Sequence, residues 1–207
     1  MKFSINIRTN KSMPIIVLAL ALVLLSVTLY ILSNVETGSK KDTLAAWEPA
    51  SRPGDMASHN PTKHSAANGI ATLTRSNGSE VQGGAGGSSK DSPNNSYYSR
   101  GWNAEYQWWQ ISRISTLGFD RIELTFFVRG SDTGPKNFTL EYSLNGIEWL
   151  PLTNSSGASI RYYIAPDNKF HQQGPHLLSA AVSNLDELHI RFNNTNNESV
   201  SGDEIKS

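Results

Sequence analysis

Three short runs of alternating apolar and polar residues, joined by two turns, constrain this chain more than any other feature. They lie between residues 118 and 152. The first run places apolar side chains at every second position: Ile122, Leu124, Phe126 and Val128. The second run repeats the pattern with Phe138, Leu140, Tyr142 and Leu144. Because a period of two is that of a β-strand with one face in a core, this stretch predicts an antiparallel, all-β core.

The turns between these runs carry their own signals. Asp132–Pro135 is rich in turn-forming residues and separates the first two strands. Asn145-Gly146 can supply the positive φ angles of a tight hairpin, after which a return strand begins at Ile147. A register slip of one residue would turn the whole apolar set to solvent. The pattern therefore predicts that three aromatic side chains are buried: Phe138, Tyr142 and Trp149.

Further strands are predicted on both sides of this core. They span residues 69–75, 106–115, 160–164 and 186–192, with a weaker pattern at 176–182. In the second of these strands, Trp109 and Ile111 fall on the core side. Residues 77–95 are rich in glycine and serine. Because no helical pattern follows, as a phosphate-binding glycine run requires, we interpret this stretch as a loop.

The N-terminal part of the chain has a different character. Residues 1–13 are basic and hold no acid, whereas residues 14–32 carry no charge. The uncharged run is close to the roughly 20 residues that a helix needs to cross a bilayer. Because a positive flank stays in the cytoplasm, we expect a single-pass transmembrane anchor with the rest of the chain outside the cell. A cleaved signal peptide and a secreted protein are the alternative, although no small-x-small site follows Leu32 directly.

Residues 33–68 differ again. They are rich in Ser, Ala, Asn and Pro and hold few side chains that could pack. Such a composition cannot offset the entropy of ordering the chain. It predicts a disordered linker, followed by a β-sandwich domain over residues 69–207.

Charge and composition exclude several classes of function. The 18 Lys and Arg balance 18 Asp and Glu, so no global charge favours nucleic acid. The chain has no cysteine, which excludes disulfides, thiolate metal sites and thiol catalysis. Its histidines form no spacing typical of metal ligands, and no hydrolase, zinc, P-loop or dinucleotide motif occurs. We therefore expect neither an enzyme nor a bound cofactor or metal.

Two motifs add a family resemblance. They are WWQIS with STLGF, between Trp108 and Phe119, and TGPKNFTLEYSLNG with a later Trp, between Thr133 and Trp149. Together they resemble a family of bacterial extracellular β-sandwich modules of the galactose-binding and discoidin-like type. The resemblance covers about residues 69–192 and implies a jelly-roll fold. Such modules are found in large surface proteins, and their usual last strand, of the type SRIDDIxI, is missing or altered here.

These observations predict a membrane-anchored, extracytoplasmic binding module without catalytic activity. Its expected ligand is a carbohydrate or cell-wall glycan. The alternative is a protein-interaction or spacer domain of a surface assembly, in which the aromatic residues belong to the core and sugar is not bound.

The loop over residues 97–103 is the expected binding site. A sugar ring packs its C–H face on an aromatic ring, while its hydroxyls require polar partners once desolvated. This loop combines both kinds of side chain. The predicted ligand contacts are Tyr98, Arg100 and Trp102, supported by Tyr97 and Asn103. The turn Asp132–Lys136 is the second choice.

Overall fold

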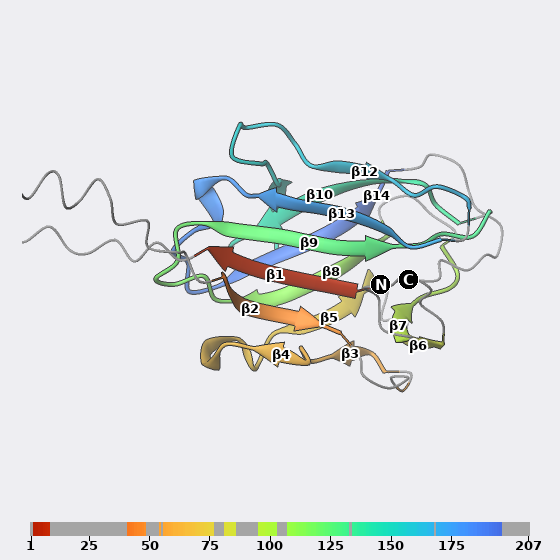
Figure 1. Ribbon diagram of the computed structural model, residues 1–207, viewed down its shortest axis with the longest axis horizontal. Coiled ribbons are helices and arrows are strands. Elements are labelled where there is room, and N and C mark those ends of the chain that lie inside the picture. Colours follow the sequence, from red (N-terminus) through yellow and green to blue (C-terminus); the bar gives the residue numbers. More distant parts are fainter. Residues whose placement is uncertain are drawn as a thin grey trace, which may run out of the picture.

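The computed structural model describes residues 2–8, 41–48, 54, 56–76, 81–85, 95–102, 107–132, 134–167 and 169–195. Two antiparallel sheets face one another (Figure 1). The five-stranded sheet has the order β13-β9-β1-β2-β4. The seven-stranded sheet has the order β11-β10-β14-β8-β5-β3, with β12 also paired to β10, and β6 pairs with β7 as a separate ribbon. The predicted all-β class is confirmed.

The bounds of the elements are as follows. The five-stranded sheet contains β1 (Lys2–Arg8), β2 (Lys41–Trp47), β4 (Lys63–His64), β9 (Ile122–Val128) and β13 (His171–Leu177). The seven-stranded sheet contains β3 (Ser58–His59), β5 (Thr72–Arg75), β8 (Trp108–Ile114), β10 (Asn137–Ser143), β11 (Leu150–Pro151), β12 (Arg161–Tyr163) and β14 (Leu188–Asn194). The ribbon is β6 (Gln82–Ala85) with β7 (Asn95–Tyr98), and two 3₁₀ turns are η1 (Ala66–Asn68) and η3 (Ala180–Val182).

The strongest alternating runs form strands of the core, as predicted, and each is hydrogen-bonded on both edges. The apolar set of β9 is at most 2% exposed along its whole length. On β8, Trp109 and Ile111 point into the core, and on β10, Phe138 and Leu140 do the same. Alternation with one face buried has therefore set the register of both sheets.

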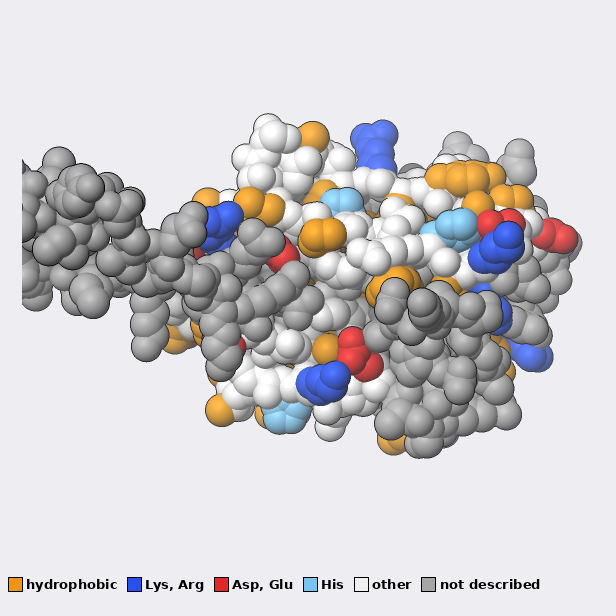
Figure 2. All heavy atoms as spheres, in the orientation of Figure 1, with side chains coloured by type: hydrophobic (Ala, Val, Ile, Leu, Met, Phe, Trp, Pro, Cys, Tyr) orange, Lys and Arg blue, Asp and Glu red, His pale blue; other side chains and the backbone are white. Residues whose placement is uncertain are grey.

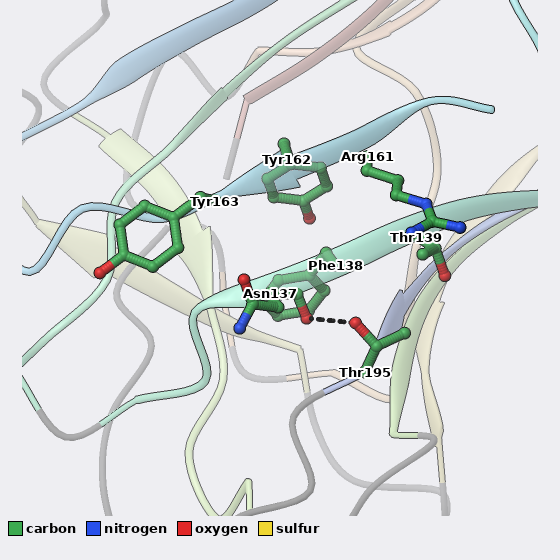
Figure 3. A pocket seen from close by; sticks show the side chains of 7 residues that line it. All are labelled: Asn137, Phe138, Thr139, Arg161, Tyr162, Tyr163 and Thr195. Atoms are coloured by element: carbon green, nitrogen blue, oxygen red, sulfur yellow. Dashed lines mark hydrogen bonds between the residues drawn. The ribbon is translucent and has the colours of Figure 1, made fainter. Parts of the chain in front are cut away.

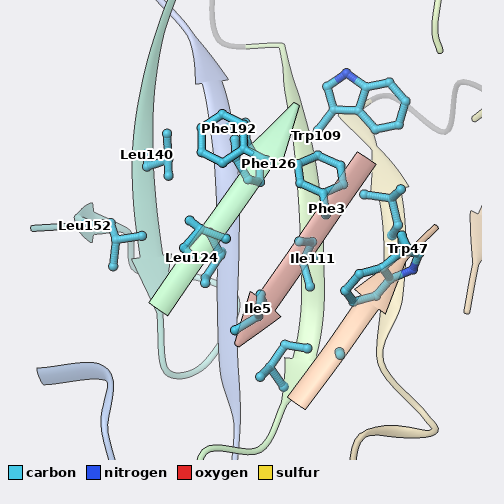
Figure 4. Close-up of a cluster of buried hydrophobic side chains, with 14 of the residues drawn as sticks. Phe3, Ile5, Trp47, Trp109, Ile111, Leu124, Phe126, Leu140, Leu152 and Phe192 are labelled. Carbon is cyan, nitrogen blue, oxygen red and sulfur yellow. The ribbon is translucent and has the colours of Figure 1, made fainter. Parts of the chain in front are cut away.

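Aromatic rings from both sheets fill the space between them (Figure 4). The ring centroid of Phe192 on β14 lies 5.0 Å from that of Phe126 on β9 and 4.6 Å from that of Phe3 on β1. Phe126 also packs edge-on against Tyr162 of β12, at 5.0 Å. These contacts join the two sheets into one core.

The hairpin after β10 is longer than the sequence predicts. Gly146 has the expected positive φ of 72°, but the return strand begins only at Leu150. In the intervening loop, the Asn145 side-chain oxygen accepts hydrogen bonds from the backbone N–H groups of Ile147 and Glu148, both at 2.9 Å. Trp149 therefore lies in this loop, where its ring packs against Arg191 and His189. Tyr142 and Trp149 are consequently only partly buried, whereas Phe138 is 2% exposed.

Two N-terminal stretches that we expected outside the domain are strands within it. β1, from the expected cytoplasmic segment, and β2, from the expected linker, pair with each other and lie inside the five-stranded sheet. Their inward side chains explain this placement, because Phe3, Leu44 and Trp47 are fully buried. The Trp47 indole N–H also donates to the His59 carbonyl at 2.9 Å. The sandwich therefore begins well before residue 69.

Three further differences concern connecting segments. Part of the expected glycine-rich loop forms the β6–β7 ribbon. The weak strand expected at 176–182 is displaced towards the N-terminus as β13 and gives way to η3. The expected transmembrane run, 14–32, lies outside the described residues, and within the described part no helix has the length and hydropathy to cross a membrane.

Candidate functional site

Two residues of the predicted loop site are core residues. Trp102 is fully buried, and its indole N–H donates to the Ser99 hydroxyl at 3.0 Å. Its ring packs edge-on against Phe138, with centroids 5.6 Å apart. Tyr97 is 2% exposed, and burial raises its pKa to about 12. Neither ring presents a face to solvent, so neither can stack on a ligand in this structure.

Two other residues of that loop point outwards. Arg100 is exposed, and its guanidinium carbon lies 5.5 Å from the ring centroid of the half-buried Tyr98. Asn103 lies outside the described residues. Of the four described residues of this predicted site, the loop therefore brings one aromatic ring and one cation together at the surface. Within the turn that was the second choice, Gly134 and Pro135 are buried, and Lys136 donates to the Ser131 carbonyl.

The outer face of the seven-stranded sheet gathers a larger set of polar and aromatic side chains. Residues paired across an antiparallel sheet share one face. One row across β12, β10, β14 and β8 contains Arg161, Thr139, Asn193 and Trp108. The next row, across β10, β14, β8 and β5, contains Glu141, Arg191, Gln110 and Thr74. We call these two rows, together with Asn137 and Tyr163 beside them, the platform.

A cleft of about 580 Å³ opens at the β12 end of the platform (Figure 3). Its lining residues are Asn137, Phe138, Thr139, Arg161, Tyr162, Tyr163 and Thr195. Tyr163 is 56% exposed, and Arg161 is also exposed on the same side of β12. The alternate residue, Tyr162, turns inwards and stacks on Phe138, with ring planes only 8° apart. This stacked pair gives the cleft a rigid base.

The C-terminal end of the described chain is fixed against the same cleft. The Thr195 hydroxyl and its backbone N–H both donate to the Asn137 carbonyl, at 3.3 Å and 3.0 Å. Residue Asn137 is itself opposite Tyr163 in the β10–β12 pair. Hydrogen bonds to a backbone carbonyl therefore hold Thr195 in place on the polar wall of the cleft.

The centre of the platform is an ion pair covered by an indole ring. Arg191 donates to the Glu141 carboxylate, and its guanidinium carbon lies 4.2 Å from the Trp149 ring centroid. Asn193 donates to the same carboxylate at 3.5 Å. The Oδ1 atom of Asn193 and the Nδ1 atom of His189 are buried without a hydrogen-bond partner among the described residues. Buried polar atoms normally have a partner, so these two atoms mark an incompletely satisfied part of the sheet.

The distribution of charge gives no reason to place a binding site on the other, five-stranded sheet. On the face shown in Figure 2, basic and acidic side chains are scattered among polar ones rather than gathered by sign. The described residues also contain no group of three or more His, Asp or Glu placed to hold a metal ion.

Sequence reasoning missed the platform, although part of its signal was present. Arg161 and Tyr163 alternate with Tyr162 in a short strand, which is the pattern of an aromatic and a cation on one face. Trp149 was expected in the core because a tight hairpin was expected. Comparison with family models, curated proteins and solved structures finds no match to this chain.

Proposed function

We propose that this chain is a non-catalytic binding module for a carbohydrate or cell-wall glycan, which it binds on the platform. The observation that carries the proposal is the cleft in which exposed Tyr163 lies beside Arg161, Asn137 and Thr139. An exposed ring supplies a surface for the apolar face of a sugar, and the polar groups around it supply partners for hydroxyls.

The rest of the platform extends this chemistry across neighbouring strands. Glu141 and Arg191 offer an acceptor and donors. Adjacent strands lie roughly 4.8 Å apart, so the rows span the width of more than one sugar ring. A chain of sugars lying across the strands therefore fits this surface better than a single monosaccharide does.

The cellular setting of this module is part of the proposal. The uncharged run 14–32 supports attachment to the cell membrane, with the sandwich on the extracellular side, where cell-wall polymers are found. The motif resemblance to galactose-binding and discoidin-like modules supports the jelly-roll assignment. Both inferences rest on the sequence alone.

Protein interaction is a second candidate function, and one surface feature favours it. Three apolar side chains next to the β10–β11 loop are exposed by more than half: Leu144, Ile147 and Leu150. Exposed apolar clusters commonly mark sites of contact with other proteins. Ile147→Ser would then disrupt a complex with a surface protein while leaving glycan binding unchanged.

Glycan binding by the full-length chain in detergent tests the main proposal. A glycan array and sedimentation with insoluble peptidoglycan identify the ligand. Tyr163→Ala should then weaken binding by about tenfold, equivalent to about 1.4 kcal/mol. Tyr98→Ala is the matched control, because Tyr98 belongs to the loop site and lies outside the platform.

Two results would contradict the proposal. If Tyr98→Ala weakened binding and Tyr163→Ala did not, the site would be the loop rather than the platform. If the folded wild-type chain bound neither soluble glycans nor peptidoglycan, the protein-interaction function would replace it. Circular dichroism and a thermal melt of each variant separate loss of binding from loss of fold.

A further inference from the structure

β1 is an interior strand of the sheet rather than an appended tail. It pairs with β9 from Lys2 to Ile7 and with β2 from Phe3 to Arg8, so both of its edges are hydrogen-bonded. Phe3 and Ile5 are fully buried between the sheets (Figure 4). Without this strand, β2 and β9 would each present an unpaired edge, which proteins generally avoid.

The connection from β1 to β2 restricts where the chain between them can go. The two strands are antiparallel, and Arg8 lies opposite Lys41. The intervening chain, which contains the uncharged run 14–32, therefore leaves and re-enters the sandwich at the same end. A helix that crossed a bilayer once within this chain would place β1 and β2 on opposite sides of the membrane.

We infer that docking of β1 and a single membrane crossing by residues 14–32 exclude one another, and that the folded protein keeps β1 on the same side of the membrane as the sandwich. The slot between β2 and β9 is a strand-acceptor site, and its occupant is the N-terminal strand of the same chain. This arrangement differs from the predicted anchor with a cytoplasmic N-terminus.

The sequence of β1 matches the slot. Its inward positions carry large apolar side chains, and the outward Ser4 lies opposite Thr125 of β9. Phe3 contacts rings of both sheets, with centroids 6.5 Å from Trp109 and 6.3 Å from Phe126. An occupant therefore needs a ring and a branched aliphatic side chain two residues apart, which Phe3 and Ile5 provide.

A cysteine pair tests the inference in the full-length protein. The chain has no cysteine of its own, so Ser4→Cys with Thr125→Cys introduces one defined pair. Opposed residues in antiparallel strands have Cα atoms roughly 4.5–5.5 Å apart, within the range that a disulfide spans. The protein is reconstituted in vesicles of phosphatidylcholine and phosphatidylglycerol and oxidised, and its mobility is compared on non-reducing gels.

Two control pairs accompany the test pair, one expected to cross-link and one expected not to. Thr72→Cys with Ser112→Cys joins β5 to β8, which are opposed inside the domain whatever happens to β1. Ser4→Cys with Phe127→Cys is offset by two residues, a separation of about 7–8 Å that disfavours a disulfide. We expect the first control and the test pair to cross-link within one chain to a similar extent, and the offset pair several-fold less.

Three outcomes would overturn the inference. Failure of the test pair to cross-link in vesicles, while the β5–β8 pair does, would mean that β1 is not docked beside the sandwich. A cross-link found only between two chains would mean that the slot takes the strand of a second copy. The offset pair cross-linking as well as the test pair would mean that β1 does not hold this register.

Discussion

The molecule contains two arginine–tryptophan pairs of similar geometry in opposite environments. The Arg75 guanidinium lies 4.8 Å from the Trp102 ring centroid inside the sandwich, and that of Arg191 lies 4.2 Å from Trp149 on the outer face. Arg75 is 5% exposed, whereas the side chain of Arg191 is 20% exposed. Nothing in the residue types alone separates the interior pair from the surface pair.

The partners of the two guanidinium groups explain the difference. Arg75 donates to the backbone carbonyls of Arg100 and Gly101, and burial lowers its pKa to about 10. Arg191 instead donates to the Glu141 carboxylate. The interior pair therefore fixes the chain that follows β7, while the surface pair lies on the platform, where we propose that a ligand binds. Strand register, which places Arg75 on the core face of β5 and Arg191 on the outer face of β14, identifies each role.

The largest expected difference in stability is between variants of the two tryptophans. Trp102→Ala should lower the free energy of unfolding by about 3–5 kcal/mol, because it empties a packed interior position. Trp149→Ala should lower it by about 1 kcal/mol or less, since the ring is partly exposed. Urea denaturation of both variants measures the difference. Equal losses would show that the two pairs do not differ in the way their burial indicates.

The cations should differ by a smaller amount. Arg75→Ala removes donors from two carbonyls and should cost about 2–3 kcal/mol of stability. Arg191→Ala breaks a solvent-accessible ion pair and should cost about 1 kcal/mol or less. The same denaturation experiment measures both, and glycan binding provides a second measurement. Arg191→Ala should weaken binding, and stable Arg75 variants should not.

The smallest effect concerns protonation. Burial lowers the pKa of His176 as it lowers that of Arg75, but only a histidine titrates near neutral pH. Since the folded-state pKa of His176 is below the unfolded value of about 6.5, its favourable effect on folding is complete above that pH. It is lost as the pH falls towards the folded-state pKa, because the unfolded chain takes up the proton first.

His176→Gln should therefore reduce the loss of stability between about pH 7.5 and pH 5. Urea midpoints of the wild type and the variant at both pH values measure this, with His64→Gln as a control at an exposed position. An acid-induced loss that is the same in His176→Gln as in the wild type would exclude His176 as a contributor.

The parts of the fold that could be predicted are those with long alternating runs. β8, β9, β10 and β14 each turn alternating apolar side chains into the core over most of their length, although β8 is irregular between Ile111 and Ile114 and β14 is buried on both faces. β1 shows the same alternation, with Phe3 and Ile5 inward, but it precedes an apolar run that indicates a membrane signal. β2 packs with small residues such as Ala45 and Ala46, which carry little periodic signal.

Of the candidate site, only the kinds of side chain could be predicted from the sequence, not their location. Aromatic rings beside polar groups were expected, and the structure has them, but on a different surface. Sequence does not reveal that Trp102 packs on Phe138, a contact between residues far apart in the chain. Nor does it reveal that Tyr163, Asn137 and Thr195 meet, because that depends on β12 pairing with β10.

The position of β1 between β2 and β9 also has a consequence for biosynthesis. Ile5 pairs with Leu124, so about 119 residues must be added before the partner strand exists. At about 5–20 residues per second, this takes about 6–24 s. Residues 14–32 emerge from the ribosome early in that interval and are available to the membrane-insertion machinery before β9 has been made. The order of translation therefore lets insertion compete with docking before the stability of the finished sheet can favour either.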